Sequence, residues 1–380
     1  MSNFLEAEIS WKNFLDKKVL EYSFKRNYDY GPYEESAVSK LSPFITHRIL
    51  FEFKLIKELQ NNYEINKVNK FIEEIYWRIY WKGWLEHNPS LWEHFLSIET
   101  KDYDKELYSL ALEGKTNLSF FNSWIFELRE FNYLHTHTRM WFASTWIFNL
   151  GLPWELGAKL FFEHLYDGDA ASNLLSWRWV AGLQTKGKQY FFTPENLIKF
   201  SNERFYVKSI YNKKINILDK YEAPPSEEIF SADMSQKSDE LIIFENDLNI
   251  ETLRNVFKNY RNVFLVLLEN QVRDIKLSEN VMNFKREIVL EFAKKVSNIK
   301  LINSKEFLFY SKNKNQFDLL YPCVGENLNF IKKYKLKNNI TIHNLVRSPD
   351  LYAWKFAKKG FFKFKENIPS INKYIEKMVW

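Results

Sequence analysis

Cysteine is almost absent from the sequence: Cys323 is the only one among 380 residues. A single cysteine excludes a disulfide framework within the chain, and it also excludes a zinc or iron–sulfur site held by four cysteines. Long apolar runs are missing as well, because no stretch of about 18 uncharged apolar residues occurs. The first residues lack the basic-then-apolar pattern of a secretory signal. We therefore expect a soluble, cytoplasmic protein that does not bind a membrane.

Aromatic residues are abundant and unevenly placed. They make up 18% of the chain, and eleven of the thirteen tryptophans precede residue 200. Charge is uneven too: residues 1–200 hold 23 basic and 26 acidic side chains, whereas the rest of the chain holds 31 and 22. A DNA-binding protein usually presents a basic face. The overall charge of +6 agrees with such a partner, but the first half of the chain is not basic on average.

The length and the apolar patterns indicate two domains. Residues 1–200 are expected to form a helical domain, with helices over 5–25 and 67–95. Residues 201–237 are expected to form a linker, because paired prolines at 224–225 lie in a polar stretch.

Residues 238–380 show short apolar runs that alternate with helical patterns, which predicts a parallel sheet covered on both faces. No glycine-rich phosphate loop follows the first run, so dinucleotide binding is not expected there. The fold class is thus an all-helical domain followed by a smaller, Rossmann-like α/β domain. The expected strands are 241–244, 263–268, 299–302, 318–324 and 340–345.

Charged residues interrupt the apolar stretch 133–192, which is the most aromatic part of the chain. Arg139 lies in an otherwise apolar segment, and Asp167 and Asp169 follow an apolar helix. Charges near a core are unfavourable unless they are paired. Arg139 and one aspartate can pair, which leaves the other aspartate and Asn173 to hold a polar ligand. The alternative is a purely structural ion pair, and Glu74 and Arg78 could likewise pair as i,i+4 neighbours on one helix.

The spacing of these residues resembles the FAD-binding core of the photolyase/cryptochrome family, in which an HN-R-RM-ASF segment is followed by a tryptophan and then by DGD-A-NN-GW-WAAG. So many matches at fixed spacing form a specific signal. The matching residues are His135, Arg139, Met140, Ala143, Ser144, Trp154, Asp167, Gly168, Asp169, Ala171, Asn173, Trp177, Trp179, Ala181, Gly182 and Thr185.

The resemblance implies three groups of site residues. The residues expected to bind FAD are Tyr22, Ser39, Leu41, Ser42, Arg78, Arg139, Asp167, Asp169 and Asn173. Those expected to face a pyrimidine dimer are Glu74, Trp77, Met140 and Trp179. Trp177 and Trp154 match the inner and middle members of an electron-transfer chain, but Ala111 occupies the outer position. Tyr108 is near that position in the sequence, and Trp141 or Trp146 could supply another route or simply pack.

The implied function is light-driven repair of UV-damaged DNA by electron transfer from reduced FAD, which is a carbon–carbon lyase activity. The alternative is a cryptochrome-like blue-light photoreceptor, and a flavoprotein that has lost both roles is a third reading. Three further departures from the family pattern are Val38, Thr136 and His137. His135 and His137 have no acidic third ligand beside them, so we expect no metal site.

The start of the second domain, LIIFENDLNIETL, resembles the opening of the family's antenna domain. In the family that domain precedes the flavin domain, so its order would be reversed here. The resemblance leaves room for an antenna chromophore in the C-terminal domain, and the alternative is an unrelated α/β domain.

Overall fold

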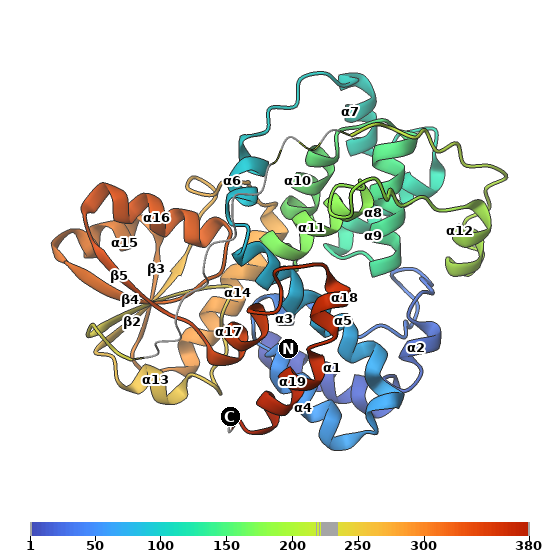
Figure 1. The fold of residues 1–380 in the computed structure, drawn as a ribbon. Helices are drawn as coiled ribbons and strands as arrows, with labels where there is room; N and C mark the ends of the chain where they lie inside the picture. Colours follow the sequence, from blue (N-terminus) through green and yellow to red (C-terminus); the bar gives the residue numbers. More distant parts are fainter. Residues whose placement is uncertain (1, 218, 220, 222–234, 379–380) are drawn as a thin grey trace.

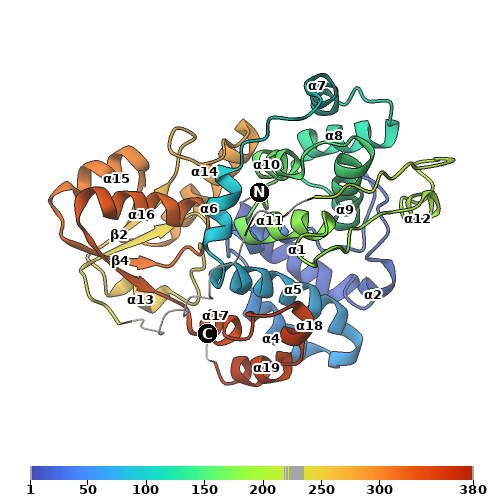
Figure 2. The ribbon, with the colours of Figure 1, turned by 45° about the horizontal axis from the view of Figure 1, so that its top comes forward.

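The computed structural model describes residues 2–217, 219, 221 and 235–378. It has a helical lobe and a lobe built on a sheet, and the last helices of the chain lie on the helical lobe (Figures 1 and 2). The prolines expected to mark the linker, at 224–225, lie outside the described residues. No helix in the described part of the chain combines the length and apolar character needed to cross a bilayer.

The first part of the chain is all helical, as expected. Its central helix is α5 (Ile65–Glu86), which packs against α4 and α11. The other elements are α1 (Asn3–Lys17), α2 (Tyr22–Lys25), α3 (Ser42–Thr46), α4 (Glu52–Asn62), α6 (Ser90–Ser97), α7 (Lys105–Glu113), α8 (Ser119–Phe131), α9 (Thr136–Ser144), η1 (Thr145–Asn149), α10 (Trp154–His164), α11 (Ala170–Val180) and α12 (Pro194–Phe200).

Two expected helices are each broken. The helix expected over 67–95 is α5 followed by α6, and the break falls at Pro89, which has no backbone N–H and disfavours helix at the residue before it. The helix expected over 5–25 is α1 followed by α2. There the chain turns after Lys17 and buries Val19 in the core.

The second part contains a five-stranded parallel sheet in the order β3-β2-β1-β4-β5. Side chains alternate between its faces: Leu241 and Ile243 join the core of the helical lobe, whereas Ile242 and Phe244 pack toward α15 and α16. The expected strand 318–324 ends early, at Leu320, before Pro322. The strands are β1 (Glu240–Phe244), β2 (Asn262–Leu267), β3 (Ile299–Asn303), β4 (Gln316–Leu320) and β5 (Thr341–Leu345).

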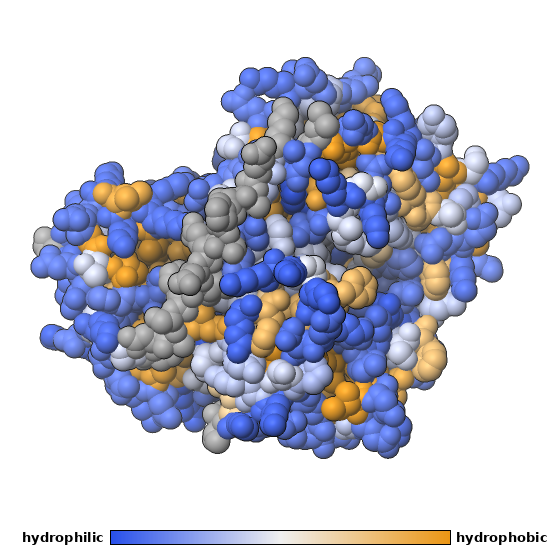
Figure 3. Space-filling view, in the orientation of Figure 1, coloured by the Kyte–Doolittle hydropathy of each residue, from blue (hydrophilic) through white to orange (hydrophobic). Residues whose placement is uncertain are grey.

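After β5 the chain leaves the sheet and returns to the helical lobe. Helices α17 and α18 pack on α5, and α19 packs on α4 (Figure 1). Hydrophilic side chains gather around α18 in the same view (Figure 3). The remaining elements are α13 (Arg254–Lys258), α14 (Glu279–Lys295), α15 (Ser304–Tyr310), η2 (Ser311–Asn313), α16 (Glu326–Asn338), α17 (Ser348–Trp354), α18 (Phe361–Lys365) and α19 (Ile368–Glu376).

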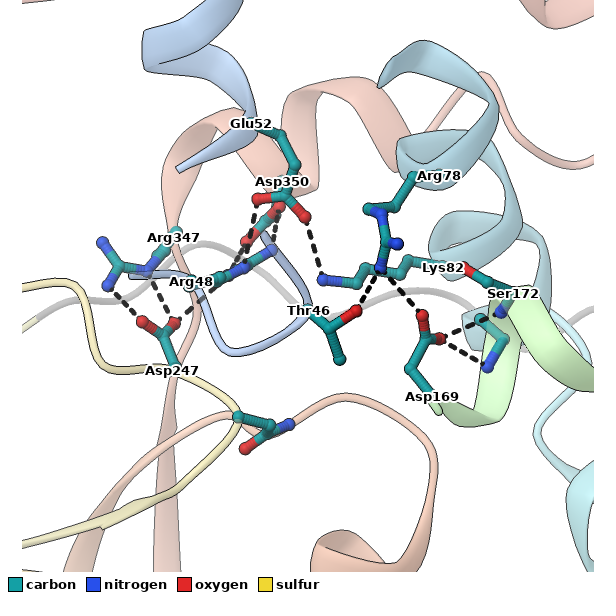
Figure 4. A network of polar contacts seen from close by, with 12 residues as sticks. Thr46, Arg48, Glu52, Arg78, Lys82, Asp169, Ser172, Asp247, Arg347 and Asp350 are labelled. Carbon is teal, nitrogen blue, oxygen red and sulfur yellow. Dashed lines mark hydrogen bonds and ion pairs between the residues drawn. The ribbon is translucent and has the colours of Figure 1, made fainter. Parts of the chain in front are cut away.

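A buried ionic network joins the two lobes around Arg48 (Figure 4). Its guanidinium contacts Asp350 at 2.7 Å, Asp247 at 3.2 Å and Glu52 at 3.5 Å. Arg347 also binds Asp247, with N–O distances of 2.7 and 2.9 Å. The network therefore ties α4 to the end of β1 and to α17, and Lys82 of α5 extends it through Glu52 at 3.0 Å.

Candidate functional site

The site begins with Asp169, which starts α11. One carboxylate oxygen accepts hydrogen bonds from the backbone N–H groups of Ala171 and Ser172, both at 2.9 Å. These bonds satisfy donors that a helix start leaves free. The other oxygen accepts from Arg78 of α5 at 3.0 Å. Arg78 thus pairs with Asp169 and not with Glu74, so the i,i+4 pair considered from the sequence does not form.

Arg139 and Asp167 form the predicted pair. Two parallel bonds join them, at 2.9 and 3.1 Å, and Arg139 Nε donates to the Leu134 carbonyl at 2.8 Å. Burial alone would raise the pKa of Asp167, but the guanidinium outweighs it and, with the Ser42 hydroxyl, holds that pKa below its usual value. Asp167 is therefore ionised and fixed, whereas 24% of the Arg139 side chain stays exposed.

Thr46 of α3 links the two pairs, and Figure 4 shows its contact with Arg78. Its hydroxyl accepts from Arg78 at 2.7 Å and donates to the Asp167 carbonyl at 3.4 Å. One polar network consequently connects α3, α5, α9 and the start of α11. Thr46 was not expected in the site from the sequence, although it lies one helical turn after Ser42, which was.

The other residues expected near the diphosphate lie around α3. Leu41 is buried, and the Ser39 hydroxyl accepts a weak hydrogen bond from the Leu41 N–H at 3.4 Å. Tyr22 is buried against Phe71, with ring centroids 4.9 Å apart. Burial raises the pKa of Tyr22, so its hydroxyl stays protonated.

Farther along α11 lie Asn173 and the first expected tryptophan of the relay. The Asn173 side chain is buried and donates to the Ala158 carbonyl at 2.8 Å. Trp177 packs so closely on Gly157 that an added Cβ would come within 2.2 Å of its ring. The same Cβ would lie 3.0 Å from Trp146 Nε1, so Trp177 and Trp146 meet across this glycine.

The expected electron relay has two candidate outer routes, one through Trp154 toward Ala111 and one through Trp146 toward Tyr108. Trp154 packs against Phe95, with ring centroids 5.7 Å apart. Ala111, at the family's outer position, is fully buried and carries no ring. Tyr108 instead meets Trp146 edge to face, with centroids 5.9 Å apart, and it is only half-buried.

The four residues expected to face a pyrimidine dimer are all half-buried and lie on α5, α9 and α11. Helix α11 packs against both other helices. Glu74 pairs with Arg26 at 2.9 Å, and Trp77 stacks on Phe361 of α18 with centroids 3.6 Å apart and planes 11° apart. Trp179 lies against Tyr190, and Met140 follows Arg139 on α9. No sequence pattern predicted a role for Phe361 in this site.

The two histidines have structural contacts. His135 caps α9 by accepting from the His137 N–H at 3.1 Å, and His137 Nδ1 lies 2.9 Å from the Asn27 carbonyl. Thr136, between them, is exposed. Within the described residues, no group of three potential ligands could hold a metal ion.

This site lies in a recognisable domain. The family description "FAD binding domain of DNA photolyase" matches residues 71–227. Residues 71–227 of the chain are thus similar to the FAD-binding domain of DNA photolyases. A photolyase-family relative from Buchnera aphidicola, a deoxyribodipyrimidine photo-lyase, is 28% identical over 195 residues, which cover 47% of this chain and 40% of the relative. A deoxyribodipyrimidine photo-lyase from Agrobacterium fabrum is 26% identical over 226 residues, covering 57% and 46%.

A crystal structure of a class III photolyase from Agrobacterium tumefaciens aligns with a TM-score of 0.46 and 26% identity, covering 52% of this chain and 42% of that one. The matched regions span less than half the length of these photolyase-family relatives.

FAD is the cofactor of this photolyase-type domain, and the residues present fit it. The hydroxyl of Ser172 and the indole N–H of Trp177 are buried without a partner in the described chain, which leaves polar groups for a ligand. A cavity of about 580 Å³ is lined in part by Ser36, Lys40 and Tyr133, and this volume is usual for cofactor sites. The Tyr133 ring lies 5.4 Å from the Arg139 guanidinium, which is the cavity's contact with the network.

Proposed function

We propose that this chain is a light-driven DNA-repair flavoprotein that splits pyrimidine dimers. The observation that carries the proposal is the placement of Glu74, Trp77 and Arg78 within two turns of α5. Arg78 belongs to the network expected to hold the cofactor, through its bond to Asp169. Glu74 and Trp77 remain half-buried beside it. One helix therefore presents a cofactor contact and two groups suited to a nucleobase.

The chemistry that bound FAD would supply is donation of an electron after absorption of blue light; the cyclobutane ring of the dimer opens and the electron returns to the flavin. In our proposal Arg139 keeps a fixed positive charge beside the cofactor, because Asp167 orients it through two hydrogen bonds. Asn173 presents an amide, which cannot supply a proton as a carboxylic acid can, and this favours a fully reduced, anionic cofactor. Arg78 and Asp169 position the same cofactor from α5 and α11.

Glu74 is proposed to bind the flipped-out pyrimidines. Burial raises its pKa, and Arg26 opposes this effect. The carboxylate oxygens of Glu74 can accept a hydrogen bond from a pyrimidine ring N–H. Trp77, Met140 and Trp179 are proposed to supply the apolar contacts that hold unstacked bases.

The electron relay is proposed to run from Trp177 through Trp146 to Tyr108. The contacts across Gly157 and the edge-to-face contact of Tyr108 support this route. Each step would move one electron inward toward the oxidised flavin, which accepts it. Tyr108 would finally lose an electron and its phenolic proton, and an external thiol would return both. Tyr108→Phe should remove a tyrosyl signal and shorten the tryptophan radical lifetime in time-resolved absorption. A loss of photoreduction in Trp154→Phe, with Tyr108→Phe unchanged, would contradict this route.

The alternative is a cryptochrome-like photoreceptor. The Arg26–Glu74 pair favours it, because Glu74 then already has a partner. The acidic average charge of residues 1–200 favours it as well. In that case the cofactor would change redox state in light without repair of DNA.

Repair is tested with the purified chain loaded with reduced FAD, a duplex that carries one thymine dimer, and blue light. Loss of the dimer, followed by chromatography, is the expected result, and a dark sample is the control. Glu74→Gln should slow repair, whereas Glu64→Gln, which changes an exposed carboxylate at the start of the same helix, should not. Intact dimers after illumination would leave the photoreceptor as the better reading.

Two further expectations remain predictions. An antenna pigment in the C-terminal domain would add an absorption band to that of the flavin in the purified protein. A cytoplasmic location would be seen by fractionation of cells that express the chain.

A further inference from the structure

The C-terminal helices place basic side chains on the helical lobe formed by the first half of the chain. Residues 1–200, which hold the site, carry 23 basic and 26 acidic side chains. The excess of basic residues belongs to the rest of the chain. Part of this excess returns to the site, because α17 and α18 pack on α5 (Figure 1).

The returning segment is uniformly basic. Residues 351–365 contain five lysines and no acidic residue. All five lysines are exposed. Solvated surface segments usually mix both signs of charge, so a run of one sign needs a reason beyond solubility. The lysines, here named the C-terminal basic patch, are Lys355, Lys358, Lys359, Lys363 and Lys365.

Most of the patch is not neutralised by the protein itself. Lys358 and Lys359 form no ion pair within the described part of the chain. Lys363 pairs with Glu366, but both side chains are more than 60% exposed, so this pair is weak. Lys365 alone has a half-buried partner, Glu73 of α5. Charge is thus available to an anion that approaches from solvent.

The patch lies directly beside the proposed lesion site. Phe361, which follows Lys359 by two residues, stacks on Trp77 at 3.6 Å. Lys365 binds Glu73, the residue before Glu74, at 2.5 Å. Between these anchors Phe362 points outward, with 80% of its surface exposed. The patch and one free aromatic ring therefore border the part of α5 that carries Glu74 and Trp77.

We propose that the C-terminal basic patch binds the phosphate backbone of DNA next to the lesion, with Phe362 against the bases. The proposal rests on the repair function proposed above. A group of exposed lysines fits the phosphates of a duplex, which position it without reading its sequence. An exposed phenyl ring at its edge fits the gap left by unstacked bases. In this arrangement the last helices supply the basic face that the first 200 residues lack.

The test compares two charge-reversed double variants of the full chain loaded with FAD. One is Lys358→Glu with Lys359→Glu; the control is Lys335→Glu with Lys337→Glu, two exposed lysines of α16 in the sheet lobe. Binding to a fluorescein-labelled duplex, damaged or intact, is followed by anisotropy over a salt series. The patch variant should lower the slope of log Kd against log salt by about 2, since each phosphate contact contributes about 0.9. The control should keep the wild-type slope.

Phe362→Ala separates the contact with bases, proposed for Phe362, from the contact with phosphates, proposed for the lysines. It should leave the salt slope unchanged and lower the preference for damaged over intact duplex, because an aromatic ring contacts bases and not phosphates. Flavin absorbance equal to that of the wild type shows that each variant is folded.

Three results would overturn the proposal. Equal slopes for the patch variant and the control, in a chain that still repairs dimers, would reject the patch and leave the function standing. If the patch variant loses binding to anionic vesicles that the wild type binds, and keeps its DNA binding, the patch would be a membrane contact instead. A wild-type chain that neither binds nor repairs DNA would reject both the patch and the proposed function.

Discussion

Arg139 and Asp167 differ sharply in their exposure. Only 2% of the Asp167 side chain is exposed, against 24% for Arg139. The carboxylate therefore depends on its partner far more than the guanidinium does. Since an unpaired buried charge is much less stable than a buried pair, the two residues should respond very differently to substitution.

Arg139→Leu should lower the free energy of unfolding by about 3–5 kcal/mol, because it leaves Asp167 buried without a cation. Urea denaturation measures the loss, and the flavin absorbance of the purified variant should fall with it.

The double variant Arg139→Leu with Asp167→Leu is the matched control. It removes both charges, so it should recover most of the lost stability without recovering the flavin. Equal stability for the single and double variants would show that the pair is not coupled.

At this scale the sequence predicted the pairing of Arg139 with one aspartate but not the partners of Arg78 and Glu74. Helical spacing alone favoured a Glu74–Arg78 pair. Arg78 instead binds Asp169 across α5 and α11, and Glu74 binds Arg26 of α2. Such partners depend on how the helices pack against one another, and the spacing of residues within one helix does not determine that packing.

Helix α5 has different surroundings in its middle and at its C-terminal end. Its middle carries Trp77 and Arg78, whereas its last residue, Glu86, contacts the sheet lobe. There Glu86 accepts hydrogen bonds from the Tyr321 hydroxyl at 2.7 Å and the Val324 N–H at 2.8 Å. Burial raises the pKa of Glu86 to about 7, and these two bonds oppose the rise. A single carboxyl group therefore couples this helix to the end of β4 in a pH-dependent way.

The pH dependence has a definite sign. The pKa of Glu86 is higher in the folded chain than its ordinary value of 4.5, so folding favours the protonated group. The contribution of Glu86 is present below about pH 4.5 and is lost as the pH rises through about 7. Relative to Glu86→Gln, the wild type should lose on the order of 3 kcal/mol of unfolding free energy between about pH 5 and about pH 9.

Urea denaturation of both proteins at the two pH values measures this difference. The glutamine stays uncharged and keeps an oxygen for the Val324 N–H, so all other titrating groups cancel in the comparison. Parallel pH profiles for the two proteins would contradict the prediction.

The type of each element was easier to predict than its ends. The apolar runs predicted five parallel strands because buried strands leave a clear pattern. The prediction of one helix over 67–95 did not take Pro89 into account. A proline disrupts a helix through local geometry, so this boundary was predictable from the sequence.

The two lobes are held together by buried charge as well as by apolar packing. Arg48 is 3% exposed and contacts acidic groups from α4, the end of β1 and α17. The apolar core also runs without a break from the helical lobe to one face of the sheet. The lobes should therefore unfold together and not in two steps.

Arg48→Met should lower the stability of the whole molecule by about 3–5 kcal/mol, because it leaves several buried carboxylates with one cation fewer. A scanning calorimeter should record one transition, shifted to lower temperature. Lys115→Met, which breaks an exposed pair with Glu113, is the control and should cost less than about 1 kcal/mol. Two separate transitions in the Arg48 variant would show that the lobes are independent.

The return of the last helices to α5 could not be predicted from the sequence. Phe361 and Trp77 are far apart along the chain, and their contact follows no local period. Net charge and composition, which are sums over segments, carry no information on such a contact.

The stack of Phe361 on Trp77 also limits how a flat guest molecule can approach. The two rings are nearly parallel and in contact, so one side of the indole is already occupied. In the proposed repair complex a base would therefore meet Trp77 on the opposite side of the indole, and the C-terminal segment would limit its orientation.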